Sequence, residues 1–87
     1  MPLSFPNMSR SYDAARQSVC FWGYDSAFEI SFYIGADALR SISSQPHRGE
    51  EGFLQAFDAN RERIQKAASK MYGRRRQSFY VLTGPDF

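Results

Sequence analysis

The chain has 87 residues, of which 43% are hydrophobic and 16% aromatic, and its formal net charge is +2 at pH 7. This composition excludes a disordered tail, and the length leaves room for one hydrophobic core, so we expect a single domain over residues 1–87. The one cysteine, Cys20, excludes an internal disulfide and a cysteine-based metal cage. The longest apolar run, 19–22, is too short to cross a bilayer, and the chain starts without signal-peptide features, so we expect a cytoplasmic protein with no membrane partner.

The first half of the chain predicts a β-hairpin. Residues 3–5 are expected to form a short strand, and the polar residues 8–16 a turn-like segment. Residues 17–24 are rich in β-branched and aromatic side chains, which favours a strand. Residues 27–34 alternate between apolar and polar with a period of two, which is typical of a half-buried antiparallel strand. The apolar face of this second strand consists of Phe28, Ile30, Phe32 and Ile34.

Two helices are predicted after the hairpin. Residues 36–42 form the first, with Asp37 in the first turn, where a carboxylate suits the positive end of the helix dipole. Residues 50–72 predict one long helix, because apolar residues recur on one face with a period of 3.6 residues. This stripe comprises Phe53, Phe57, Ile64, Ala67, Ala68 and Met71. Gly73 is expected to end the helix in a left-handed conformation.

A last strand is predicted over residues 78–83, before Gly84 and Pro85. The resulting order is strand, strand, short helix, long helix, strand, which favours an α+β fold over an alternating parallel sheet. We therefore expect a three- to four-stranded, mainly antiparallel sheet with the short helix and the long helix packed on one face.

A series of short motifs runs through nearly the whole chain. They are Phe5-Pro6, Tyr12-Asp13, Val19-x-Phe21-Trp22, Ala38-Leu39, Phe57-Asp58-Ala59-Asn60-Arg61, Ile64, Val81-Leu82 and Asp86-Phe87. In this order and spacing the chain resembles the bacterial family known as domain of unknown function 1488, whose members are small proteins of similar length. The resemblance implies a bacterial origin, and it supplies no catalytic, cofactor-binding or metal-binding residues.

Asn60 falls on the otherwise apolar stripe of the long helix, where a buried amide must find partners or cost about 1–3 kcal/mol. Asn60 and Arg61 are therefore a candidate buried polar site, with both side chains directed at a ligand beneath the helix. The alternative is structural: Asn60 hydrogen-bonds the backbone of a loop, with residues 12–16 the candidate. Most side-chain hydrogen bonds go to backbone or water, which favours the structural interpretation.

The positive charge is concentrated in residues 61–87, where seven basic side chains stand against two acidic ones, giving +5. Within this segment Lys70, Arg74, Arg75 and Arg76 form a candidate interaction surface together with the nearby rings of Tyr72, Phe79 and Tyr80. Basic side chains bind phosphates and aromatic rings stack on bases, so this surface suits a nucleic acid. Alternatively, the arginines complement the helix dipole and keep the surface solvated, since no recognised nucleic-acid motif is present.

A second candidate interaction surface is the hairpin face that carries Trp22, Tyr24 and Tyr33. Three aromatic side chains on an uncovered sheet face would form a patch of the kind found in interfaces. The alternative is that the N-terminal segment, with Leu3 and Phe5, folds over these rings. The sequence leaves both interpretations open.

The remaining reactive residues indicate no chemistry. Cys20 is expected to be a buried or half-buried structural thiol, since no basic partner is near in sequence. His47 stands alone, so no metal site is expected. No glycine-rich phosphate loop or nucleophile elbow is present, so we expect no cofactor and no enzyme activity. The sequence favours an interaction or accessory module that binds an unknown protein or a second copy of itself, and the alternative is a weak nucleic-acid-binding, regulatory protein.

Overall fold

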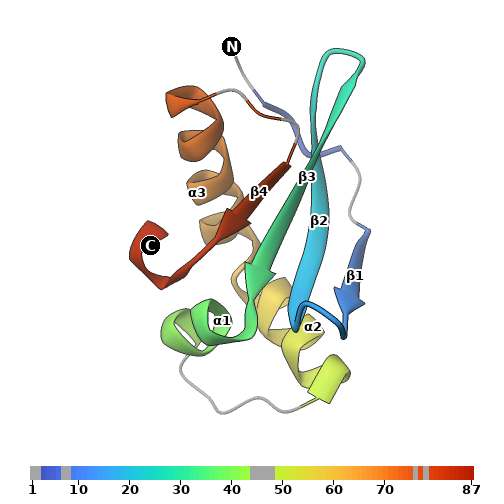
Figure 1. The fold of residues 1–87 in the computed structure, drawn as a ribbon, viewed down its shortest axis with the longest axis vertical. Coiled ribbons are helices and arrows are strands. Elements are labelled where there is room, and N and C mark those ends of the chain that lie inside the picture. The colour runs from blue at the N-terminus through green and yellow to red at the C-terminus, as the bar shows by residue number, and fades with distance from the viewer. Residues whose placement is uncertain (1–2, 7–8, 44–48, 76, 78) are drawn as a thin grey trace.

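The computed structural model describes residues 3–6, 9–43, 49–75, 77 and 79–87 (Figure 1). His47 and Arg76, both considered above, lie outside these residues. The elements in chain order are β1 (Arg10–Asp13), β2 (Ser18–Asp25), β3 (Phe28–Gly35), α1 (Ala36–Ile42), α2 (Gly49–Ala59), α3 (Arg61–Arg74), β4 (Phe79–Leu82) and the 3₁₀ turn η1 (Gly84–Asp86). Among the described helices, none is long and apolar enough to cross a membrane.

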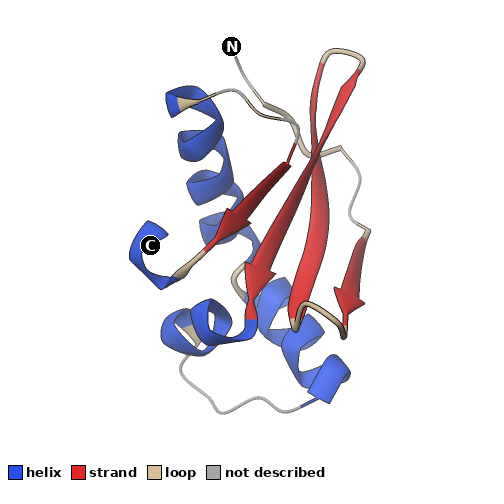
Figure 2. Cartoon of the chain, in the orientation of Figure 1, coloured by secondary structure: helices blue, strands red, loops and turns tan. Residues whose placement is uncertain are grey.

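The four strands form one sheet in the order β1-β2-β3-β4 (Figure 2). The β1/β2 and β2/β3 pairs are antiparallel, whereas β3 and β4 are parallel. The sheet is therefore mixed, and antiparallel in two of its three pairings. This confirms the predicted α+β class and the predicted strand number and direction. It also confirms the hairpin, in which β2 and β3 pair over their full length.

The N-terminal region differs from the prediction. Residues 10–13 form strand β1 rather than a turn, and residues 3–5 form no strand, only an isolated bridge from Ser4 to Tyr24. The reason lies in the tertiary contacts of residues 10–13. The ring of Tyr12 stacks on Phe53 of α2 with centroids 5.8 Å apart, and Arg10 forms an ion pair with Asp58 at 2.8 Å. These contacts hold a polar segment in an extended conformation against β2.

The single long helix predicted over residues 50–72 is also wrong, because the chain breaks at Asn60 into α2 and α3. The backbone of Asn60 has φ −118° and ψ 17°, and its side-chain Nδ2 donates to the carbonyl of Ala56 at 2.9 Å. An amide that bonds to its own backbone in this way competes with helix continuation. Gly73 lies inside α3 rather than ending it, and Arg75 closes the last turn by donating its N–H to Met71.

The core lies between one face of the sheet and the helices. Phe57 of α2 packs on Phe21 of β2 with ring centroids 5.0 Å apart, and Tyr72 of α3 packs edge-on against Tyr80 of β4. In Figure 1, α3 runs beside β4 and α2 lies against the ends of β1 and β2. The largest fully buried side chains are Phe32, Phe57, Ile34, Leu39, Ile64, Leu82 and Val19.

Candidate functional site

The face of the sheet that turns away from the helices gathers five large apolar or aromatic side chains. In the strand register Trp22 pairs with Ser31, Ser31 with Phe79, and Tyr33 with Val81, and paired residues share a face. We call this surface the open face and define it by Trp22, Tyr24, Tyr33, Phe79 and Val81. The first three are half-buried, whereas Phe79 and Val81 are 51% and 47% exposed. Sequence reasoning missed Val81, although the alternation in β4 was available to find it.

The N-terminal segment does not cover the open face. Phe5 packs on the opposite face, with its ring centroid 6.2 Å from Phe21 and 6.1 Å from Phe32. Leu3 and Phe5 also fill the space above Gly23, where an added Cβ would lie 2.9 Å from the Phe5 ring. The idea that this segment folds over Trp22, Tyr24 and Tyr33 is therefore wrong. Within the described part of the chain, no element packs over the open face.

Of the charged groups around the open face, Asp13 and Arg16 pair with each other, whereas Glu29 is bonded to a neutral hydroxyl. The hydroxyl of Tyr24 donates to Glu29 at 2.7 Å. Asp13 and Arg16 form an ion pair at 3.5 Å, and the Arg16 guanidinium lies over the Tyr33 ring at 4.6 Å from its centroid. A cation held over a ring in this way is attracted to the negative face of the ring. The open face is therefore aromatic and carries a weak net negative charge, since two carboxylates, Asp13 and Glu29, stand against one guanidinium, Arg16.

Cys20 lies on the same side of β2 as Trp22, opposite Tyr33. It is a free thiol and only 8% exposed, which confirms the expectation of a buried cysteine. Burial raises the pKa of this thiol, and a hydrogen bond with Tyr33 offsets part of that effect. Because the reactive form of cysteine is the thiolate, this environment disfavours nucleophilic chemistry.

The candidate basic surface is less complete than the sequence indicated. Lys70, Arg74 and Arg75 are exposed at the end of α3, in the helix layer. Two of the rings expected to stack on bases, Tyr72 and Tyr80, instead face the core and are 6% and 4% exposed. The third ring, Phe79, lies on the open face and packs edge-on against Tyr33, so the structure groups Lys70, Arg74 and Arg75 near one another but not with these rings.

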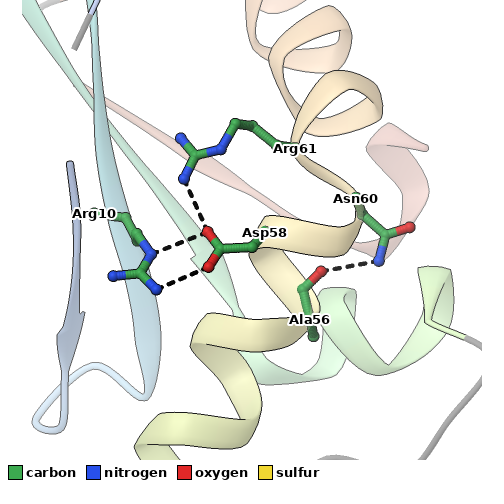
Figure 3. Close-up of polar contacts among 5 residues, drawn as sticks. All are labelled: Arg10, Ala56, Asp58, Asn60 and Arg61. Atoms are coloured by element: carbon green, nitrogen blue, oxygen red, sulfur yellow. Dashed lines mark hydrogen bonds and ion pairs between the residues drawn. The ribbon is translucent and has the colours of Figure 1, made fainter. Parts of the chain in front are cut away.

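Asn60 and Arg61 point in different directions and form no common site (Figure 3). Asn60 is half-buried and donates to Ala56 of the preceding helix, α2, rather than to the loop 12–16. Arg61 lies over the Phe57 ring and donates to Asp58 at 2.8 Å. Asp58 also accepts two hydrogen bonds from Arg10, at 3.0 and 2.8 Å. These bonds hold the pKa of the Asp58 carboxyl below its usual value, Arg10 contributing most.

The described residues contain no cluster of three histidine, cysteine, aspartate or glutamate side chains that could hold a metal ion. What they do contain is a polar clamp, Arg10–Asp58–Arg61, that joins β1 to the start of α3. This arrangement holds elements together, and nothing in it is aimed at a ligand.

These features define a small α+β protein whose mixed four-stranded sheet is covered by helices on one face and, among the residues that the structure describes, open on the other. The chain belongs to the family described as protein of unknown function (DUF1488), whose model matches residues 3–82, which confirms the resemblance seen in the motifs. A solved structure from Shewanella loihica PV-4, described as a protein of unknown function from this family, superposes with a TM-score of 0.81. It is 19% identical and the match covers 92% of this chain and 90% of that one, so the likeness shows the fold. No curated protein matches the chain.

Proposed function

We propose that this protein is a non-catalytic interaction module that binds another protein through the open face. The observation that carries the proposal is the set of four neighbouring side chains Trp22, Tyr33, Phe79 and Val81 on a sheet face that no described element covers. Aromatic residues clustered in this way are enriched at the centres of protein interfaces, where they supply most of the binding energy. The proposal keeps the cytoplasmic location expected above.

The charge distribution favours a protein partner over a nucleic acid. Binding to phosphates requires basic side chains that are available around the stacking rings. Arg16, which lies at the open face, is engaged by Asp13 and Tyr33. Arg74 and Arg75 stand at the end of α3, in the layer on the other side of the sheet. The complementary surface is therefore an apolar, weakly charged patch of a folded protein.

Site-specific photo-crosslinking in cells tests this proposal. A benzophenone side chain replaces Tyr33 in one variant and Arg63, which is exposed on α3, in the control. We expect covalent protein adducts from position 33 and none of the same mass from position 63. Equal adducts from both positions, or none from position 33, would contradict binding through the open face.

A direct measurement with the purified adduct partner completes the test. Trp22 is the one tryptophan of the chain, so its emission reports on the open face alone. We expect the partner to shift this emission, and Tyr33→Ser to weaken binding by at least tenfold. Phe28→Ser is the matched control, because Phe28 is 75% exposed but lies outside the open face.

Oligonucleotide binding tests the alternative partner. If the chain binds oligonucleotides in a salt-dependent way, and Arg74→Ala/Arg75→Ala abolishes this binding, the partner is a nucleic acid instead.

A further inference from the structure

Strand β4 is one edge of the sheet, with β3 as its neighbour on one side. On its other side no described strand pairs with it. An edge strand presents a row of backbone N–H and C=O groups that can pair with another chain, and proteins commonly protect such edges with charges, prolines or bulges. Whether β4 carries such protection therefore bears on whether it pairs.

The two edges of the sheet differ in this respect. β1, at the opposite edge, carries Arg10 and Asp13, and Arg10 is tied to Asp58 of α2 by two hydrogen bonds. β4 reads Phe-Tyr-Val-Leu and contains no charged residue and no proline. Its two outward side chains, Phe79 and Val81, are half exposed. By these criteria β1 is protected against pairing with another chain, whereas β4 lacks this protection.

We propose that β4 pairs antiparallel with β4 of a second copy of this chain. The two copies are related by a two-fold axis that stands perpendicular to the sheet and passes midway between the two Tyr80 residues. This register places Phe79 of each copy opposite Val81 of the other, an aromatic and β-branched pair of the kind that stabilises sheets. The axis keeps both helix layers on one side. The two sheets become one sheet of eight strands, and the two open faces become one continuous surface.

The charges that flank β4 fit this antiparallel arrangement. Arg74 and Arg75 precede the strand, and both are exposed without an ion pair to any described residue. Asp86 follows the strand, in η1. In an antiparallel pair the basic start of each strand approaches the acidic end of the other, twice by symmetry. A parallel pair would bring like charges together at both ends, so charge complementarity selects the antiparallel orientation.

The interface is small, since each copy contributes one strand of four residues. Association is therefore expected to be weak and concentration-dependent. The inference goes beyond the proposed function, because it concerns the edge of the sheet rather than its open face.

Sedimentation velocity from about 10 µM to about 1 mM tests the inference. We expect the wild-type chain to shift from monomer to dimer in this range, and to dissociate at high salt as the flanking charges are screened. Val81→Lys, which places a charge on the edge, should stay monomeric with an unchanged circular dichroism spectrum. Phe28→Lys replaces an exposed aromatic residue away from β4 and should dimerise like the wild type.

A disulfide test fixes the register. In the variant Phe79→Cys/Val81→Cys, position 79 of one copy faces position 81 of the other, within bridging distance for directly opposed residues. Mass spectrometry should find the intermolecular 79–81 bond. A monomer throughout the concentration range, or a dimer that survives Val81→Lys, would overturn edge pairing. Because Val81 also belongs to the open face, Tyr33→Ser separates the two modes: it leaves β4 unchanged and should still dimerise, and a dimer lost in Tyr33→Ser would mean that the copies pack through the open face instead.

Discussion

At the scale of single residues, Asp58 joins side chains from two other parts of the chain. Its carboxylate accepts hydrogen bonds from Arg10 of β1 and from Arg61 at the start of α3. It therefore links the edge of the sheet to both sides of the helix break. The ion pairs are partly open to solvent, since the Asp58 side chain is 42% exposed, and this limits their energy.

The first prediction concerns the pH dependence of this clamp. The pKa of Asp58 is lowered in the folded state, so its stabilising contribution is present above the unfolded pKa and is lost as pH falls through the lower, folded value. We expect Asp58→Asn to reduce the free energy of unfolding at pH 7 by about 1 kcal/mol or less. Urea denaturation should show the difference from wild type shrinking below about pH 4.

Asp37→Asn is the control for this prediction. Asp37 also pairs with an arginine, Arg40, at 2.8 Å, but its side chain is fully exposed. We expect only the small loss of its interaction with the dipole of α1, because full exposure screens both that interaction and the ion pair. A difference for Asp58→Asn that stays constant from pH 7 to pH 2 would show that the carboxylate charge does not stabilise the clamp.

A second prediction at this scale concerns Gly23, above which the N-terminal segment packs. A Cβ at this position would lie 2.9 Å from Phe5 and 3.2 Å from Leu3. We expect Gly23→Ala to lower the free energy of unfolding by about 1–3 kcal/mol, as overpacking does, and to speed proteolysis within residues 1–9. Gly35→Ala, where an added Cβ meets nothing within 4 Å, should leave both measurements close to wild type.

At the scale of elements, the hairpin was predictable and β1 was not. The alternation in residues 27–34 is a local pattern that one apolar face imposes, and it predicts β3 without any knowledge of the rest of the chain. The residues of β1 are polar, and the side chains that hold them, Phe53 and Asp58, lie more than 40 positions away. Contacts of this kind leave no local signal in the sequence.

The helix break has a similar cause. Phe53, Phe57 and Ile64 keep one apolar face through Asn60, so the hydrophobic pattern continues where the backbone does not. The hydrogen bond from the Asn60 side chain to the Ala56 carbonyl does not change the spacing of apolar residues, so the hydrophobic pattern does not reveal it. The aromatic members of the open face could be predicted from the alternation of side chains along the strands. That the face is uncovered could not be predicted, because it depends on the tertiary contacts of residues 3–5.

The third prediction tests how the two helices dock on the sheet. Phe57 and Ile64 are fully buried, one on each side of the break. We expect Phe57→Ala to cost about 3–5 kcal/mol and Ile64→Ala about 2–5 kcal/mol of the free energy of unfolding, measured by chemical denaturation. A cost below 1 kcal/mol for either variant would mean that its helix contributes little to the core.

At the scale of the whole molecule, stability rests on packing. The chain measures 35 × 22 × 21 Å along its principal axes, and its one cysteine forms no disulfide. A domain of this size buries a modest fraction of its surface, so a second copy that binds only the folded form would add noticeably to its stability.

The fourth prediction follows from this linkage. If β4 pairs between copies, the Tm should rise as protein concentration increases from about 10 µM to about 1 mM. The Tm of Val81→Lys should stay constant over the same range, and that of Phe28→Lys should follow the wild type. Differential scanning calorimetry makes the measurement. A concentration-independent Tm in the wild-type chain would argue against association of the folded state.

The parallel pairing of β3 with β4 has a consequence for how the chain folds. Neighbouring parallel strands need a long crossover, and here it spans residues 36–78, including all three α-helices. β4 can therefore dock only after the segment that holds those helices has been synthesised. Until then β3, with Phe32 and Ile34, has an unpaired edge, and a nascent or slowly refolding chain is exposed to aggregation through that strand.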